Sequence, residues 1–166
     1  MGVSGSGKTT LGRLLARRRG VPFVEGDDLH PAANIAKMSA GKPLDDEDRV
    51  PWLRAVAARI GAATQAGEGA VISCSALKYA YRQLFRAAGP GVWFLQLDLD
   101  PADARARVAH RAGHFMPAAL ITSQYEVLEP LRAGEPGLRV DATAGREAVL
   151  EAVEAALADL ERRPPR

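Results

Sequence analysis

The stretch Gly2-Val3-Ser4-Gly5-Ser6-Gly7-Lys8-Thr9 fits the phosphate-binding loop G-x-x-x-x-G-K-[ST] at every fixed position. Its glycines let the backbone curl so that several N–H groups point into one concavity, where phosphate oxygens can lie. An amphipathic helix is expected directly afterwards, over residues 9–19, and its N-terminus adds the positive end of a helix dipole. A flexible Gly/Ser turn that happens to precede a lysine would not account for this helix. The loop therefore predicts a protein that binds a nucleoside triphosphate.

Individual residues of this loop have distinct expected roles. Lys8 is expected to reach the β- and γ-phosphates and is a candidate catalytic residue, and the Thr9 hydroxyl is expected to coordinate magnesium. ATP and Mg2+ are therefore the expected cofactors. The loop residues predicted to bind the nucleotide are Gly2, Ser4, Gly5, Ser6, Gly7, Lys8, Thr9 and Thr10.

Length and composition bound the class of protein. The 166 residues are enough for one domain with a core, and we expect a single kinase domain over residues 1–166. The net charge of +2 is too small to argue for nucleic acid or a membrane surface as a partner. Cys74 is the only cysteine, which favours a reducing compartment. No apolar run approaches the roughly 18 residues of a membrane span, and no signal peptide precedes the loop, so a cytoplasmic location is expected.

Short apolar runs alternate with helical patterns along the chain. Strands are expected over residues 21–24, 70–74, 92–97 and 138–140, and helices over residues 31–40, 45–65, 77–88, 101–110, 117–128 and 146–161. This alternation predicts an α/β fold with a parallel sheet covered by helices on both faces. Sites in such sheets lie at the carboxyl ends of the strands, where this chain places its polar clusters.

The segment Gly26-Asp27-Asp28-Leu29-His30-Pro31 places carboxylates at the end of the first expected strand. A carboxylate there could accept a proton from an attacking hydroxyl, or hold magnesium through water. Two structural alternatives stay open: Asp27 caps the helix that begins near Pro31, and His30 is a partly buried structural histidine.

Three cations are candidates for binding an acidic acceptor. Arg49 lies in the first turn of an expected helix, where a cation is unfavourable without a partner. Lys78 and Arg82 are one helical turn apart and could together clamp a carboxylate. The alternative for this pair is the solvated face of a surface helix.

Further segments carry a resemblance to a known family. In order along the chain they are the phosphate loop, Gly26-Asp27-Asp28-Leu29-His30-Pro31, Asn34-Ile35-Ala36-Lys37-Met38, Gly41-Lys42-Pro43-Leu44, Asp48-Arg49, Pro51-Trp52-Leu53, Cys74-Ser75-Ala76-Leu77-Lys78, Tyr81-Arg82, Gly113-His114-Phe115 and Ser123-Gln124. This set resembles the gluconate kinase family of phosphate-loop kinases. The resemblance covers residues 1 to about 131, and the Asp-x-Leu-His-Pro, Cys-Ser-Ala-Leu-Lys and Gly-His-Phe segments together are close to diagnostic.

The resemblance implies transfer of the γ-phosphoryl of ATP to the terminal hydroxyl of D-gluconate, giving 6-phosphogluconate. Asp27 would orient or deprotonate that hydroxyl, and Glu25 would hold a magnesium-bound water beside Thr9. The residues that the resemblance implies for gluconate binding are Asp27, His30, Arg49, Lys78, Arg82 and Gln124. The resemblance also suggests a homodimer.

A basic segment precedes Gly113, and in kinases of this shape a mobile lid closes there over the nucleotide. We expect the lid at about residues 111–128. Arg111 is the candidate for neutralising charge on the transferred phosphoryl, and Arg107 for packing on the adenine, beside the Asp141-Ala142-Thr143 loop. The alternative for both arginines is a solvated basic face.

The implied fold is that of nucleoside monophosphate kinases, with the strand order 2-3-1-4-5. Its central strand should precede the phosphate loop, but only Met1 stands there, so the first strand is apparently missing. Unpaired edge groups cost about 1–3 kcal/mol each when buried. We expect either a start about ten residues further upstream, or a sheet that closes differently or borrows a strand from a partner chain.

Other functions stay open. The nearest rivals are shikimate kinase and adenylylsulfate kinase, which should lack the Asp-x-Leu-His-Pro and Cys-Ser-Ala-Leu-Lys pair. A nucleotide-binding regulator that hydrolyses ATP slowly belongs to a different class, and ATPase activity unaffected by any sugar acid would support it. A further alternative is a protein that descends from a kinase but is inactive because its first strand is missing.

Overall fold

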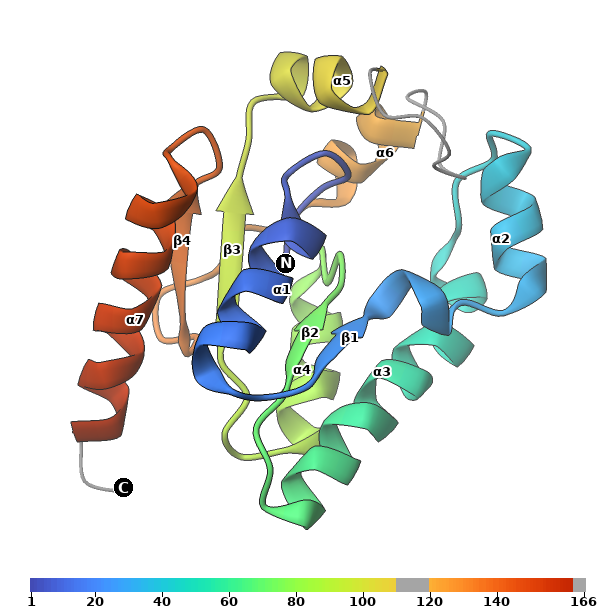
Figure 1. Ribbon diagram of the computed structural model, residues 1–166. Helices are drawn as coiled ribbons and strands as arrows, with labels where there is room; N and C mark the ends of the chain where they lie inside the picture. Colours follow the sequence, from blue (N-terminus) through green and yellow to red (C-terminus); the bar gives the residue numbers. More distant parts are fainter. Residues whose placement is uncertain (110–119, 163–166) are drawn as a thin grey trace.

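In the computed structural model, which describes residues 1–109 and 120–162, four parallel strands form two separate pairs. Strand β1 (Phe23–Glu25) pairs with β2 (Val71–Ser73), and β3 (Phe94–Asp98) pairs with β4 (Gly137–Asp141). Figure 1 shows the chain's N-terminus and helix α1 (Lys8–Arg19) between the two pairs. The predicted parallel α/β architecture is confirmed, and the pairs match the outer positions of the expected 2-3-1-4-5 order.

Among the described residues, Met1 alone lies at the position of a central strand. Its amino group donates to the Leu95 carbonyl, and the Leu97 N–H donates to the Met1 carbonyl over 2.9 Å. These two bonds flank Gln96, so Met1 stands opposite Gln96 in a parallel ladder. Met1 therefore adds one residue of parallel pairing to the edge of β3 that faces β2.

The remaining helices lie close to their predicted positions. They are α2 (Ala32–Ser39), α3 (Asp46–Ala66), α4 (Tyr79–Ala88), α5 (Pro101–Ala109), α6 (Leu120–Val127) and α7 (Arg146–Arg162). Asp45 caps α3, and its carboxylate and that of Asp48 each accept a hydrogen bond from the other's backbone N–H. Pro51 lies inside α3.

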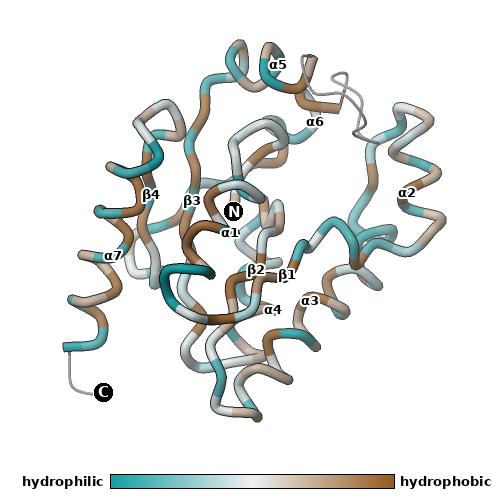
Figure 2. The backbone as a smooth tube through the Cα atoms, viewed as in Figure 1, coloured by the Kyte–Doolittle hydropathy of each residue, from teal (hydrophilic) through white to brown (hydrophobic). Residues whose placement is uncertain are grey.

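Helices cover both faces of the strands. On one face, Leu11 and Leu15 of α1 and Leu150 of α7 pack around Leu97. On the other face, Trp52 of α3 and Phe85 of α4 pack with neighbouring side chains of β2 and β3. Figure 2 shows hydrophobic residues along the inner segments and hydrophilic residues along the outer turns. No helix within the described ranges is both long and apolar enough to cross a membrane.

Candidate active site

The phosphate loop has a backbone that glycine adopts readily. Gly2, Gly5 and Gly7 have φ angles of 144°, 83° and 92°. A Cβ on Gly5 would lie 3.0 Å from the Ala104 carbonyl oxygen, so both conformation and space require glycine there. Helix α1 starts at Lys8, directly after Gly7, so the N–H groups of its first turn, which have no acceptor within the helix, lie at the loop.

Polar side chains line this loop. The Ser6 hydroxyl is buried and has no hydrogen-bond partner among the described residues. The Lys8 ammonium donates to the Val3 carbonyl across the loop over 2.9 Å. Thr10 is exposed in the first turn of α1. A buried hydroxyl without a partner fits a loop that takes an anion from outside the chain.

The two predicted metal residues lie together. The Thr9 hydroxyl donates to Glu25 Oε2 over 2.7 Å, and the Ser73 hydroxyl donates to the other oxygen of the same carboxylate. The described part of the chain contains no group of three or more acidic, histidine or cysteine side chains placed so that they could hold a metal ion by themselves. This donor set fits magnesium, which in such sites takes its remaining ligands from phosphates and water.

A pocket at the carboxyl end of β1 opens onto the phosphate loop. It brings together four of the residues predicted to bind the acceptor, and Ser4 and Lys8 belong to the same lining. Those four residues are Asp27, His30, Arg49 and Gln124. Asp27 lies in a short 3-10 helix, η1 (Gly26–Leu29), that extends β1 toward this pocket and was not predicted.

His30 and Trp52 form one wall of this acceptor pocket. Their rings stack with centroids 4.7 Å apart and an interplanar angle of 9°. The Trp52 indole N–H donates to the Gly26 carbonyl over 2.8 Å, which holds the ring against η1. Burial lowers the pKa of His30, so its imidazole is neutral near pH 7. A neutral imidazole both donates and accepts, as contact with a polyol requires.

Arg49 is held by protein partners at the pocket's edge. Its guanidinium lies 3.4 Å from the Tyr81 hydroxyl and 3.8 Å from the Asp46 carboxylate. Asp46 also accepts from the Lys78 ammonium at 2.7 Å, and hydrogen bonds from Lys78 and Tyr81 hold the pKa of that carboxyl low. Asp46 therefore supplies the partner that a cation in the first turn of α3 requires.

The predicted clamp formed by Lys78 and Arg82 is wrong. Lys78 pairs with Asp46, whereas Arg82 is fully buried and forms a two-bond pair with Glu135 at 2.7 and 2.8 Å. The Arg82 guanidinium also donates to the carbonyls of Glu129 and Pro130. Neither cation lines the acceptor pocket. Arg82 instead joins α4 to the segment before β4, which is a structural role.

Two residues connect more distant segments to the phosphate loop. Gln124 of α6 accepts from the Ser4 backbone N–H over 2.7 Å. Arg107 of α5 donates to the Gly5 carbonyl at 3.5 Å and to the Ala142 carbonyl at 3.2 Å. The predicted Arg111 lies outside the described residues, as does much of the expected lid at 111–128.

Sequence comparisons agree with this arrangement. The chain is 49% identical over 142 residues to the thermosensitive gluconokinase of Escherichia coli strain K12, covering 85% of this chain and 76% of that protein. It is 46% identical over 151 residues to the gluconokinase of Gluconobacter oxydans strain 621H, covering 91% and 85% of the two chains. The chain belongs to the gluconokinase family. A family model described as an AAA domain matches residues 1–131.

Solved structures of related kinases have the same fold as this chain. A crystal structure of a gluconokinase from Sinorhizobium meliloti 1021 has a TM-score of 0.85 at 43% identity, covering 96% of this chain and 90% of that one. A sugar kinase from Janibacter sp. HTCC2649 gives 0.90 at 44% identity, covering 95% and 91%. Shikimate kinase from Aquifex aeolicus shares the fold alone, with a TM-score of 0.65 at 14% identity.

Several residues of this gluconokinase-family pocket were not predicted as site residues. Trp52, Ser75 and Ser123 line it beside the predicted ones. Asn34 is buried next to it, with its amide 3.4 Å from His30 Nδ1 and 2.8 Å from the Asp48 carbonyl. Each of these residues lies within a segment that carried the family resemblance, and that was the only signal available for them.

Proposed function

We propose that this protein transfers the γ-phosphoryl group of ATP to the terminal hydroxyl of D-gluconate, giving 6-phospho-D-gluconate and ADP. The observation that carries the proposal is the shared lining of the acceptor pocket. Lys8 and Ser4 of the phosphate loop and Asp27 of η1 face the same pocket. A hydroxyl held by Asp27 would therefore lie next to a phosphate held by the loop.

In the proposed reaction, Asp27 accepts the hydrogen bond of the attacking hydroxyl and takes its proton as the new P–O bond forms. The bond between the γ-phosphorus and the β,γ-bridging oxygen breaks, and the electron pair stays on ADP. Lys8 and the loop N–H groups hold the phosphate oxygens in position. Positioning and charge neutralisation supply most of the catalysis in such transfers, so a weak base is sufficient.

Magnesium, when bound, would be held by Thr9 with Glu25 beside it and would neutralise phosphate charge. His30, Arg49 and Gln124 are proposed to bind the polyol and carboxylate of gluconate. Arg107 and the loop around Ala142 are proposed to border the adenine, and Arg111 to neutralise charge on the transferred group. A cytoplasmic location and a homodimer belong to the same proposal.

The test of this function is ADP release from Mg-ATP with and without D-gluconate, with shikimate and a nucleoside monophosphate as alternative acceptors. We expect release that depends on gluconate and is lost in Lys8→Ala, which also excludes a contaminating kinase. Release stimulated by another acceptor, or ATP hydrolysis unaffected by all of them, would overturn the proposal.

The metal assignment predicts a specific defect. Replacing the carboxylate in Glu25→Gln should raise the magnesium concentration that gives half-maximal activity by about 10- to 100-fold, as for other groups that orient metal ligands. The measurement is a magnesium titration at saturating ATP and gluconate. Glu151→Gln, which changes an exposed residue of α7, is the matched control and should leave the titration unchanged. An unaltered titration in Glu25→Gln would remove Glu25 from the metal site.

A further inference from the structure

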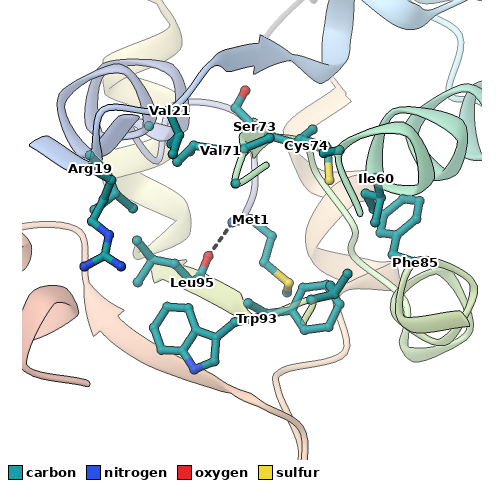
Figure 3. Close-up of a pocket in the computed structure, with 18 of the residues that line it drawn as sticks. Met1, Arg19, Val21, Ile60, Val71, Ser73, Cys74, Phe85, Trp93 and Leu95 are labelled. Atoms are coloured by element: carbon teal, nitrogen blue, oxygen red, sulfur yellow. Dashed lines mark hydrogen bonds between the residues drawn. The ribbon is translucent and has the colours of Figure 1, made fainter. Parts of the chain in front are cut away.

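The acceptor pocket offers a ligand different chemistry from the cavity between β2 and β3. Figure 3 shows that cavity, whose lining is mostly apolar and includes Val71, Leu95 and Phe85. The acceptor pocket is lined by charged and polar side chains, among them His30. A neutral imidazole can present either a donor or an acceptor to a ligand. The chemistry of the acceptor pocket therefore depends on which ring nitrogen of His30 carries the hydrogen.

The side-chain amide of Asn34 has an orientation that Asp48 determines. The amide nitrogen, Nδ2, lies 2.8 Å from the Asp48 backbone carbonyl oxygen. A carbonyl oxygen only accepts hydrogen bonds, so the atom of the amide that faces it is the NH2 nitrogen and not the oxygen. Asn34 is only 5% exposed, and buried polar groups in proteins are almost always hydrogen-bonded. One hydrogen of the NH2 group is thus used by Asp48.

The same NH2 group faces the ring of His30. Nδ2 of Asn34 lies 3.4 Å from His30 Nδ1. An NH2 group can only donate, so this contact is favourable only when Nδ1 carries no hydrogen and accepts. The ring is neutral near pH 7, so its single N–H is then on Nε2. The Asn34 amide therefore favours one of the two neutral tautomers of His30.

Other contacts hold the ring of His30 in place. Trp52 stacks against one face of it, and the Trp52 indole is itself bonded to the Gly26 carbonyl. The His30 backbone N–H donates to the Asp27 carbonyl over 3.3 Å at the end of η1. Within residues 1–109 and 120–162, no protein group bonds to Nε2 of His30, which lines the acceptor pocket. The Nε2–H group is therefore left for the acceptor.

Two charged side chains of the same pocket act on His30. Beyond the effect of burial, Asp27 raises the pKa of His30 and Arg49 lowers it. Under the proposed function, Asp27 serves the attacking hydroxyl and Arg49 binds the carboxylate of gluconate. The Nε2–H donor is uncharged, so it complements a hydroxyl oxygen of the polyol.

We propose that Asn34 is a positioning residue that fixes His30 as the Nε2–H tautomer, and that this N–H donates to a hydroxyl oxygen of the sugar acid. The contact with the sugar acid rests on the proposed function, whereas the tautomer is a property of the protein without substrate. Asn34 does not line the acceptor pocket itself, so its effect on the acceptor passes through His30.

Nitrogen NMR of the histidine side chains tests the tautomer without any substrate. The chain has three histidines, and the signals of His30 are those that disappear in His30→Phe. At a pH where the spectra show neutral His30, we expect a pyridine-like Nδ1 and a pyrrole-like Nε2. In Asn34→Asp a carboxylate faces Nδ1 and accepts its hydrogen, so the two signals should exchange character. A pyrrole-like Nδ1 in the unsubstituted protein, or unchanged signals in Asn34→Asp, would overturn the proposal.

Lys37→Gln is the matched control for Asn34→Asp. Lys37 is also on α2 and, like Asn34, bonds to Asp48 of α3, but it does not line the acceptor pocket. The substitution removes a connection between the two helices without altering the contact to Nδ1. We expect the His30 signals to keep their character. An exchange of character in Lys37→Gln as well would mean that loosening of α2 is the cause, which contradicts a specific role of Asn34.

Steady-state kinetics tests the contact with the sugar acid. At a pH where His30 is neutral, Asn34→Asp should raise the KM for gluconate about 10-fold, as for a hydrogen bond left unmade, with little change in the KM for ATP. His30→Phe keeps a ring against Trp52 but removes the donor. In that background Asn34→Asp should raise the KM no further, because its effect passes through His30.

Two kinetic results would contradict the proposal. An exchanged tautomer with an unchanged KM for gluconate would show that the Nε2–H group does not contact the acceptor. Additive effects of Asn34→Asp and His30→Phe would show that Asn34 acts by another route. Failure of the proposed function is seen separately, as an absence of gluconate-dependent ADP release from the unsubstituted protein, and the NMR spectra do not depend on it.

Discussion

Replacing Asp27 with asparagine is expected to lower kcat for gluconate phosphorylation by about 10²- to 10⁴-fold, the range for loss of a general acid or base. The amide keeps the size of the side chain and can still contact a hydroxyl, but it cannot take up a proton. The KM for ATP should change little, because Asp27 lies on the acceptor side of the pocket. Steady-state kinetics with both substrates varied will measure this.

Asp28→Asn is the control for Asp27→Asn. Asp28 is adjacent in η1 and exposed, and it does not line the acceptor pocket. We expect it to retain nearly full activity. If both variants lose activity equally, or if Asp27→Asn changes only the KM for gluconate, Asp27 does not act on the attacking hydroxyl.

Replacing Arg82 with methionine is expected to lower the free energy of unfolding by about 3–5 kcal/mol, because it leaves the buried carboxylate of Glu135 without its partner. Total domain stability is only about 5–15 kcal/mol, so the variant should be close to unfolding at 37 °C. Denaturant unfolding of the purified proteins gives the measurement. Arg86→Met on the exposed face of the same helix is the matched control and should be nearly neutral.

A second variant separates structure from substrate binding at this position. Arg82→Met combined with Glu135→Leu removes both charges, and replacing a buried ion pair by apolar residues is often neutral. The double variant should recover most of the lost stability and keep the KM for gluconate. A stable double variant with a strongly raised KM for gluconate would instead restore Arg82 to the acceptor site.

Much of the fold could be predicted because its signals are local. The glycines and Lys8 of the phosphate loop fix a backbone shape, and Asp45 caps α3 with its own neighbours. Alternation of apolar runs with helical patterns then requires parallel pairing. The short helix η1 escaped prediction because its four residues carry no periodicity, and it depends on Trp52 bonding to Gly26 from another helix.

The acceptor site could be predicted in part. Asp27 and His30 follow a strand end, which a parallel sheet places at its functional edge. Arg82 was misassigned because helical spacing indicates which side chains share a face, but not which face the neighbouring segment covers. Its partner Glu135 lies in a loop at a sequence separation of 53, and no pattern in either segment indicates the pairing.

The separation of the strand pairs also divides the two substrates. Asp27 and His30 stand on the β1 side, whereas Arg107 reaches the Ala142 carbonyl just beyond β4. Gln124 of α6 joins the acceptor pocket from the side of α5. In-line attack therefore depends on the distance between the two halves. If the distance between the halves varies, turnover should slow while both dissociation constants change little. A share of the γ-phosphoryl groups would then be transferred to water instead of to the sugar acid.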